Sequence, residues 1–524
     1  MKKTLYVLCL ILISANVMAQ YDNTLFDAVP SDYKKASLSY AKTITKEDLK
    51  KHLFVLASDS LEGRETGEPG QKKAAAYIKN HFQNELNIPP IAELEKGYYQ
   101  PFPLSIKPPN GASLSINGKV HNFQSDFYYF GRFEDQKITG NEVVFLGYGI
   151  DDKIYSNYKG QDLEDKILLI FDGVPKKIKK KNKSEAWMAN WRIKIDLAAE
   201  MGAKALLIID EEFDSNSKKL SHYIEKPYVK LATDSAENNI PVFYIRPEIA
   251  KSILNKSDED YNKLYKKSQK KPSSEVLQCN ITLDVKRTEK KVSSENVLGF
   301  IEGTDKKEEI IVLTAHYDHL GKINDKIFYG ADDDGSGTAA LMELAEAFSK
   351  AKEEGKGPRR SILIMPVAGE EKGLLGSRYY TEFPVFPLEN TVVNLNIDMI
   401  GRLDPEHEGN PNYIYLIGSD KLSTELHLLS EETNRIYSKL ELDYTYNDEN
   451  DPNRYYYRSD HWNFAKNEIP VIFYFNGVHE DYHKETDTVD KIDFEKMEKI
   501  TRLIFHTAWE LANREERISL DINQ

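Results

Sequence analysis

Residues 310–321 read IIVLTAHYDHLG, and residues 330–337 read GADDDGSG. The apolar run 310–315 is short and rich in β-branched side chains, as in a buried parallel strand. After the acidic stretch, residues 338–352 carry apolar side chains at helical spacing. This order of strand, polar loop and helix places the polar side chains at the carboxyl edge of a sheet. We therefore expect an α/β fold with its functional site at that edge.

The same alternation of strand and helix patterns continues to the end of the chain. Strands are expected at 297–301, 310–315, 362–367, 392–397 and 470–475, and a helix is expected at 494–511. Together these patterns predict a mostly parallel mixed sheet flanked by helices on both faces.

Helical patterns also fill most of residues 45–86, interrupted by a glycine-rich loop at 61–70. In that loop, Arg64 is interpreted either as a contact to substrate or subunit or as part of a solvated loop.

Length and composition suit a protein of two or three domains. The chain has 524 residues, 40% of them hydrophobic, and a formal net charge of −14. Such acidity argues against nucleic acid as a partner, because nucleic acid binding usually needs a basic face. Residues 108–286 form a β-rich block without clustered ligand residues. We interpret it as an inserted domain between 20–107, the N-terminal part of the main domain, and 287–524, its catalytic part.

The first 19 residues have the pattern of a signal peptide. Lys2 and Lys3 precede an apolar run at 5–13, and residues 17–19 read VMA, a small-residue cleavage pattern. The apolar run is shorter than the roughly 20 residues that span a membrane. We expect an exported protein, periplasmic or extracellular, with no membrane span in the mature chain. Cleavage would also remove Cys9, leaving Cys279 as the only thiol and excluding an intrachain disulfide.

Residues able to bind a metal follow several of the expected strands. They are His316 and Asp318, the acidic residues 332–334, Glu370 and Glu371, Asp398, and His483. A single histidine at a strand end is usually structural, but several successive strands that deliver such residues to one edge favour a metal site. Imidazoles and carboxylates suit zinc, with manganese or cobalt as alternatives. So many carboxylates would repel one another without cations, which favours two ions over one.

A two-metal site assigns different roles to these residues. One aspartate bridges the ions, and a water between them becomes a hydroxide near neutral pH. Another carboxylate must act as general base. Adjacent Glu370 and Glu371 fit this division into base and ligand, and Asp318 would orient the imidazole of His316.

Five motifs carry a resemblance to a known family. They are HYD at 316–318, GADDDGSG at 330–337, GEEKGLLGS at 369–377, NIDMIG at 396–401 and YHKETDT at 482–488. This set resembles the co-catalytic dizinc aminopeptidases, bacterial secreted enzymes related to glutamate carboxypeptidase II and the transferrin receptor. The resemblance covers the chain from about residue 295 to the C-terminus. The block 108–286 is similar to the protease-associated domain that such enzymes often carry.

The resemblance implies two zinc ions and a role for each matched residue. His316, Asp333 and Asp398 would hold one ion, with Asp333 bridging to the other. Glu371 and His483 would complete the second set.

It implies further that Glu370 is the general base and that Asp318 supports His316. Tyr456 matches the tyrosine that stabilises the oxyanion in some members, with Tyr455 and Tyr457 as neighbouring alternatives. The other two aspartates of the loop, Asp332 and Asp334, are expected to shape it. Residues 459–461 would support the site, with a core or loop role as the alternative for His461.

Several other functions remain as alternatives to an exported zinc aminopeptidase acting on peptides. Residues 479–483 read HEDYH and satisfy the single-zinc HExxH motif, but that motif needs a helix and the context here is a loop. A carboxypeptidase would need a cation for the terminal carboxylate, such as Arg402 or Arg458. A glutaminyl cyclase would use one zinc, and a receptor-like binding protein none. The oligomeric state is left open.

Overall fold

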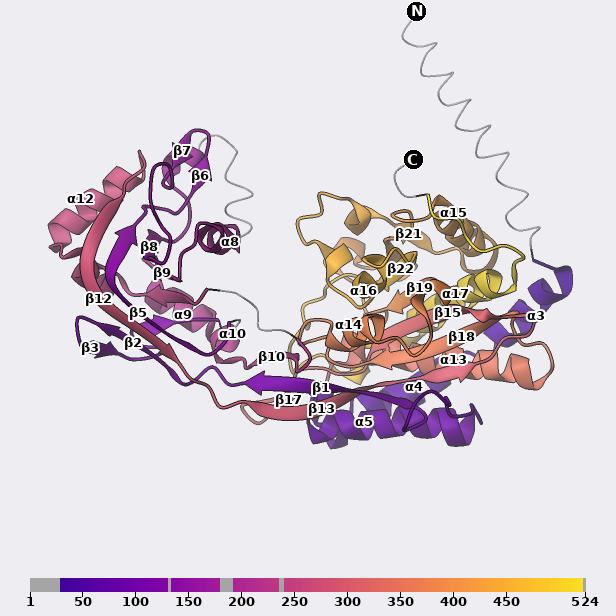
Figure 1. Cartoon of the computed structure of the whole chain (residues 1–524). Helices are drawn as coiled ribbons and strands as arrows, with labels where there is room; N and C mark the ends of the chain where they lie inside the picture. The colour runs from indigo at the N-terminus through magenta and orange to yellow at the C-terminus, as the bar shows by residue number, and fades with distance from the viewer. Residues whose placement is uncertain (1–28, 131–132, 180–191, 235–239, 522–524) are drawn as a thin grey trace, which may run out of the picture. The chain divides into compact units, whose positions relative to one another are not determined.

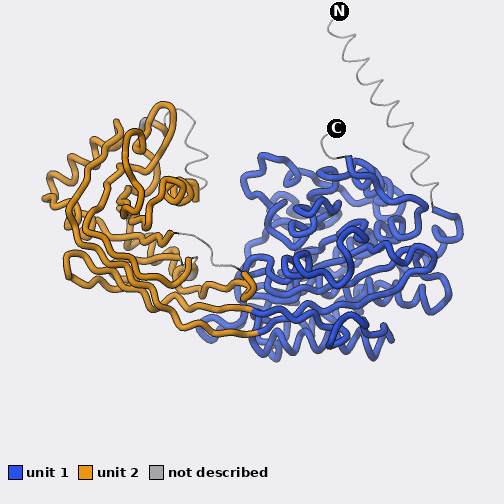
Figure 2. Tube along the Cα trace, viewed as in Figure 1, with its two compact units in different colours: residues 1–103, 293–524 blue, residues 104–292 orange. Residues whose placement is uncertain are grey.

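The structure, a computed structural model, describes residues 29–130, 133–179, 192–234 and 240–521 (Figure 1). The expected signal segment 1–19 lies outside these residues. The chain divides into two compact units, Met1–Pro103 with Ser293–Gln524, and Leu104–Val292 (Figure 2). The second unit contains the block 108–286, and its identity as a protease-associated domain remains a prediction.

Unit 1 is built on a seven-stranded mixed sheet. In spatial order the strands are β14 (Gly299–Ile301), β18 (Arg360–Val367), β15 (Lys306–His316), β19 (Thr391–Ile397), β22 (Val471–Phe475), β20 (Tyr413–Ile417) and β21 (Glu441–Asp443). The four strands from β18 to β22 run parallel. β14 pairs antiparallel with β18 and β20 pairs antiparallel with β22, whereas β21 pairs parallel with β20. The expected mostly parallel mixed sheet is confirmed, and the sequence patterns missed β20 and β21.

Helices cover both faces of this sheet. On one face, α13 (Gly337–Glu353) and α17 (Phe494–Asn513) pack on β15 and β18, with α3 (Ser31–Ala41) and α4 (Lys46–Leu56) behind them. On the other face, α14 (Leu375–Glu382) and α16 (His461–Ala465) contribute to an apolar cluster that includes Val312 and Val471. These strands can be largely apolar because both of their faces are buried.

Local sequence explains where the main helices begin. Asp493 caps α17, its side chain accepting hydrogen bonds from the backbone of Glu495 and Lys496. Thr45 caps α4 in the same way through the backbone N–H of Asp48. The helices expected at 338–352 and 494–511 are confirmed as α13 and α17. Among the described residues, no helix combines the length and the apolar character needed to cross a membrane.

Unit 2 contains an eight-stranded mixed sheet of its own. Its central strands β5 (Gln136–Phe145), β8 (Ile167–Phe171), β9 (Ala205–Ile209) and β11 (Val242–Ile245) run parallel. The remaining strands are β3 (Lys119–His121), β2 (Ala112–Ile116), β12 (Glu275–Val285) and β4 (Phe127–Tyr128). The helices α8 (Arg192–Glu200), α11 (Pro247–Leu254) and α12 (Asp258–Ser268) belong to this unit. Both groups of described residues with the geometry to hold a metal ion lie in unit 1.

Candidate metal centre

Parallel strands bring the predicted site residues to one edge of the unit 1 sheet. His316 ends β15, the residue pair 370–371 follows β18, Asp398 follows β19, and His483 lies in the loop after β22. The loop after β15 continues through Ala331–Ser336 into α13. Because the carboxyl ends of parallel strands meet at the same edge, residues far apart in the sequence become neighbours here.

His316 faces two carboxylates with one ring nitrogen. Its Nε2 lies 3.1 Å from Asp333 Oδ1 and 3.6 Å from Asp398 Oδ1, while Nδ1 lies 3.0 Å from the carbonyl oxygen of Asp318. Burial by itself would lower the pKa of His316, but the carboxylates of Glu370 and Asp398 raise it well above its ordinary value. The hydroxyl of Ser459 donates to Asp398 Oδ2 at 2.7 Å and fixes that carboxylate. Nε2 is therefore the nitrogen available to a metal.

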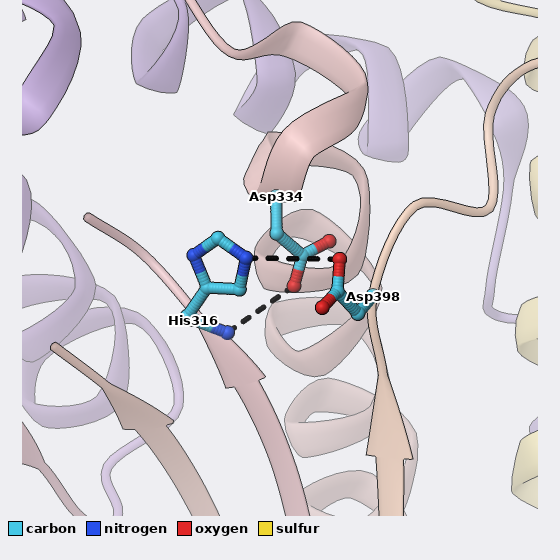
Figure 3. A group of neighbouring side chains, drawn as sticks. All are labelled: His316, Asp334 and Asp398. Atoms are coloured by element: carbon cyan, nitrogen blue, oxygen red, sulfur yellow. Dashed lines mark hydrogen bonds and ion pairs between the residues drawn. The ribbon is translucent and has the colours of Figure 1, made fainter. Parts of the chain in front are cut away.

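Asp334 also lies beside His316 and Asp398, as Figure 3 shows. Its carboxylate, however, accepts hydrogen bonds from the backbone N–H groups of His316 at 3.2 Å, Gly337 at 2.8 Å and Met399 at 3.1 Å. By contrast, Asp333 Oδ2 is buried and has no hydrogen-bond partner among the described residues. Buried carboxylate oxygens are normally paired, so this atom fits a metal. Asp333 is thus the aspartate with an oxygen available to a metal, whereas Asp334 fastens the end of β15 to α13.

The second half of the centre gathers around the other oxygen of Asp333. His483 Nε2 lies 3.2 Å from Asp333 Oδ2 and 3.3 Å from Glu371 Oε1. Burial would lower the pKa of His483, but the carboxylates of Glu371 and Asp333 raise it to about 10. Burial would raise the pKa of Glu371, but His483 and His319 hold it well below its ordinary value. One oxygen of Asp333 faces each histidine, which is the arrangement a bridging ligand needs.

Glu370 stands next to the ligands without joining either half. Its Oε2 is 4.0 Å from His316 Nε2, and its side chain is 12% exposed. Burial is the largest effect on the pKa of Glu370 and raises it well above the ordinary value, with a smaller increase from Glu371 and an opposing effect from His316. The backbone N–H of Glu370 donates to Asp318 Oδ1 at 3.2 Å. Asp318 therefore meets His316 through its carbonyl oxygen and positions Glu370 through its carboxylate.

A pocket opens beside these residues. It is lined by His316, Asp333, Glu370, Asp398, Met399, Tyr455, Arg458, Phe473, Phe475, Val478, Tyr482 and His483. Six of these residues are aromatic or apolar, three carry carboxylates, two are histidines, and Arg458 contributes a guanidinium. Tyr456 is not among the lining residues, and its ring packs against Trp462 and His461. The oxyanion role expected for Tyr456 remains a prediction, while Tyr455 and Tyr482 are the tyrosines that line the pocket.

The ligand-bearing region also matches a family model. Residues 296–508, which include all the metal-facing residues described above, match the model of peptidase family M28. We call this matched stretch, residues 296–508, the M28 domain.

Relatives of the M28 domain include two fungal proteins. A probable zinc metalloprotease of Pyrenophora teres f. teres (strain 0-1) is 28% identical over 42% of this chain and 52% of that protein. A probable leucine aminopeptidase of Arthroderma otae (strain ATCC MYA-4605 / CBS 113480) is 32% identical over 40% of this chain and 55% of that protein. The chain thus spans about half the length of these curated relatives.

One solved structure is similar to this chain over more than the M28 domain. An aminopeptidase from Aneurinibacillus sp. strain AM-1 aligns with 93% of this chain and 98% of its own, with a TM-score of 0.56 and 20% identity. At this identity the likeness is one of fold.

The loop that carries Asp333 in the M28 domain is held by residues that the sequence did not identify. Arg64 is fully buried and donates to four carbonyl oxygens, those of Tyr317, Leu56, Tyr329 and Gly330, at 2.6–2.8 Å. Both sequence interpretations of Arg64 are wrong, because its donors are engaged with backbone groups.

From the other side of the loop, Asp487 accepts hydrogen bonds from the backbone of Asp332 at 3.0 Å and Asp333 at 3.2 Å. Its place in the YHKETDT motif was a signal that could have identified it. No local pattern distinguishes Arg64 from a solvated loop residue.

The HExxH alternative is excluded by the conformation of residues 479–483. They form turns after β22 in place of a helix. His479 Nε2 lies 3.3 Å from Asp332 Oδ2, whereas His483 faces Asp333 and Glu371. Glu480 is 78% exposed and pairs with Arg402. The two histidines therefore serve different partners.

Proposed function

We propose that this protein is an exported dizinc aminopeptidase that removes N-terminal residues from peptides. The observation that carries the proposal is Asp333, which directs one carboxylate oxygen to His316 and the other to His483. Asp398 and Glu371 complete two ligand sets that share this aspartate. The names of the relatives, a probable zinc metalloprotease and a probable leucine aminopeptidase, support the same activity.

The donor set fits zinc. Two imidazoles and three carboxylates are ligands that zinc accepts, and the buried Asp333 Oδ2 without a hydrogen-bond partner among the described residues marks where a cation belongs. When bound, two zinc ions would polarise the scissile carbonyl and lower the pKa of water. Ser459 fixes the orientation of the Asp398 carboxylate, and the carbonyl oxygen of Asp318 fixes that of the His316 ring.

Glu370 moves the proton in this proposal. Its carboxylate takes a proton from the attacking water and returns it to the nitrogen of the leaving amine, so it starts and ends the cycle ionised. The hydrogen bond from its backbone to Asp318 holds it beside the ligands. A raised pKa, due mainly to burial, makes the carboxylate a stronger base than an exposed glutamate.

The pocket suits the N-terminal end of a peptide. Phe473, Phe475 and Val478 supply an apolar wall for a side chain. Glu370 and Asp398 add negative charge that attracts a protonated α-amine, and this favours an aminopeptidase.

Arg458 is the observation that favours a carboxypeptidase as the second candidate, because its guanidinium lines the pocket and a terminal carboxylate needs a cation. Arg402 is engaged with Asp481 at 3.0 Å. A matched pair of peptides separates the two activities, one with a free amine and an amidated C-terminus, the other acetylated with a free C-terminus. We expect hydrolysis of the first peptide only. Hydrolysis of the acetylated peptide alone would establish the carboxypeptidase.

Substitution of the base tests the mechanism. Glu370→Gln should lower kcat by about 10²–10⁴ because the proton acceptor is lost, while the content of two zinc ions per chain, measured by elemental analysis, stays unchanged. Glu480→Gln is the matched control on an exposed glutamate and should keep near wild-type activity. Equal effects of the two substitutions would refute the role of Glu370. Export is tested by N-terminal sequencing of the mature protein, which should begin at Gln20.

A further inference from the structure

His319 occupies an unusual position beside the second half of the centre. Its side chain is fully buried, and neither ring nitrogen makes a hydrogen bond with a described residue. Nδ1 lies 3.0 Å from Glu371 Oε1 and 3.8 Å from Asp333 Oδ2. The imidazole is therefore directed at the same two carboxylates that face His483.

The fold makes room for this imidazole. Gly330 has φ +54°, and a Cβ atom there would lie 2.5 Å from Cγ of His319 and 2.2 Å from the backbone oxygen of Asp333. A side chain at position 330 would displace either the histidine or the bridging aspartate. Lack of a side chain at Gly330 thus lets the ring and Asp333 approach each other.

An ordinary hydrogen bond does not account for the position of His319. Nδ1 and Glu371 Oε1 form an ion-pair contact at 3.0 Å whose angles do not fit a hydrogen bond, and Nε2 has no hydrogen-bond partner among the described residues. A buried imidazole without hydrogen bonds is rare unless a metal or an ordered water takes the place of the partner. His461 shows the alternative: it is also fully buried and without a hydrogen bond to a described residue, but its ring stacks on Phe473, whereas His319 faces two carboxylates. Burial lowers the pKa of His461 to about 3, as for a neutral core histidine.

We propose that His319 is a fourth protein ligand of the second metal ion, an inference that rests on the proposed dizinc function. The second ion would then be held by His319, Asp333, Glu371 and His483, and the first by His316, Asp333 and Asp398. Four protein ligands close a zinc site, whereas three leave a position open for water or substrate. The second ion would accordingly be the more tightly held of the two.

Zinc affinity of the intact protein tests this inference. Competition with a chelator should resolve two ions of unequal affinity in the wild type. Loss of a residue that holds a metal ligand in position typically lowers metal affinity 10–100-fold. Loss of a ligand itself should therefore lower the affinity by more than about 100-fold. We expect His319→Ala and His319→Gln both to weaken the tighter ion by more than that factor. The Gln variant decides between the roles, because it can still donate a hydrogen bond to Glu371.

A cysteine at this position gives a direct spectroscopic readout. Cobalt-loaded His319→Cys should show thiolate-to-cobalt charge-transfer absorption that the cobalt-loaded wild type lacks, because a thiolate would occupy the coordination sphere. His461→Cys is the matched control, a buried histidine outside the ligand cluster, and should show none. Circular dichroism of each variant verifies that it is folded.

The possible outcomes distinguish a failure of this inference from a failure of the proposed dizinc function. If the wild type binds no zinc, the proposed function fails. If the wild type binds two ions and His319→Gln retains them within about 100-fold, or if folded His319→Cys gives no charge-transfer absorption, then His319 is not a ligand and the dizinc proposal stands.

Discussion

Arg64 shows how strongly one residue governs the shape of the site. Its guanidinium joins the end of α4 to the backbone on both sides of the ligand loop, through Leu56, Tyr317 and Gly330. Burial lowers the pKa of Arg64, and the carboxylates of Asp318 and Asp333 oppose that shift. The buried cation therefore serves both as a donor to carbonyls and as a counter-charge to the acidic cluster.

Arg64→Met should destabilise the protein by about 3 kcal/mol or more. Each buried carbonyl left without a donor costs about 1–3 kcal/mol, and four lose theirs. Urea unfolding of the metal-loaded protein measures the loss. Arg435→Met, on a 69% exposed arginine, is the control and should change stability by less than about 0.5 kcal/mol. Similar values for both variants would show that Arg64 is not structural.

Three tyrosines in or near the pocket, Tyr455, Tyr456 and Tyr482, can be ranked by their place around it. Tyr482 lines it and stacks on His483, with ring centroids 3.9 Å apart. Burial, together with the carboxylates of Asp333 and Glu371, raises the pKa of Tyr482, so its hydroxyl stays a donor. Tyr482→Phe should therefore lower kcat more than Tyr456→Phe, with Tyr455→Phe as the third member of the series. The reverse order would support the assignment of Tyr456 that the family resemblance implies.

At the scale of elements, α4 and α13 enclose an acid–base pair between them. His52 Nε2 lies 3.4 Å from Glu343 Oε1, and both side chains are buried. Burial raises the pKa of Glu343 to about 8 and lowers that of His52 to about 4. The folded protein thus keeps Glu343 protonated, and His52 neutral, over a pH range in which the unfolded chain does not.

The two shifts act on stability with opposite signs. Between pH 4 and 6.5 the unfolded chain binds the His52 proton and the folded protein does not, so His52 raises the free energy of unfolding as pH rises. From pH 4.5 to about 8 the folded protein alone holds the Glu343 proton, so Glu343 lowers the free energy of unfolding as pH rises. Of this pair, only Glu343 contributes between pH 6.5 and 8.

Glu343→Gln should remove that part of the pH dependence. One proton contributes up to about 1.4 kcal/mol per pH unit, so wild type should lose about 2 kcal/mol more than the variant between pH 6.5 and 8. Urea unfolding at both values measures the difference. Glu353→Gln, on an exposed residue of the same helix, should follow the wild type. Parallel pH profiles for wild type and Glu343→Gln would contradict the prediction.

At the scale of the whole molecule, the two units differ in what stabilises them. Unit 2 has its own apolar cores, formed by the parallel strands β5, β8, β9 and β11 and the helices around them. Unit 1 holds most of the buried carboxylates and both groups of described residues with the geometry of a metal site. Bound ions should therefore contribute to the stability of unit 1 in particular.

Chelation of the metal should lower the melting temperature of unit 1 and leave that of unit 2 unchanged. A ligand present at 1,000 times its Kd stabilises the folded state by about 4 kcal/mol, and repulsion among the bare carboxylates adds to the loss. Calorimetry with and without chelator measures both transitions. Leu207→Ala in the core of unit 2 identifies the second transition by shifting it alone. A shift of both transitions on chelation would contradict the prediction.

The sequence by itself determined the parallel sheet and the strand ends at which the predicted ligands lie. Apolar runs identify buried strands, and the residue that follows each run must lie at the carboxyl edge, so His316, Glu371 and Asp398 could be placed from local pattern alone. β20 and β21, at one side of the sheet, were missed.

The family resemblance implied Asp333 within the run 332–334, and the tertiary structure supplied the physical reason; only the tertiary structure decided that Arg64 is buried and that His319 points at Glu371. These roles depend on hydrogen bonds from distant backbone groups, such as the N–H of Met399 to Asp334, and on space left by Gly330. Local spacing brings side chains to an edge of the sheet, whereas long-range contacts determine which of their atoms remain available for chemistry.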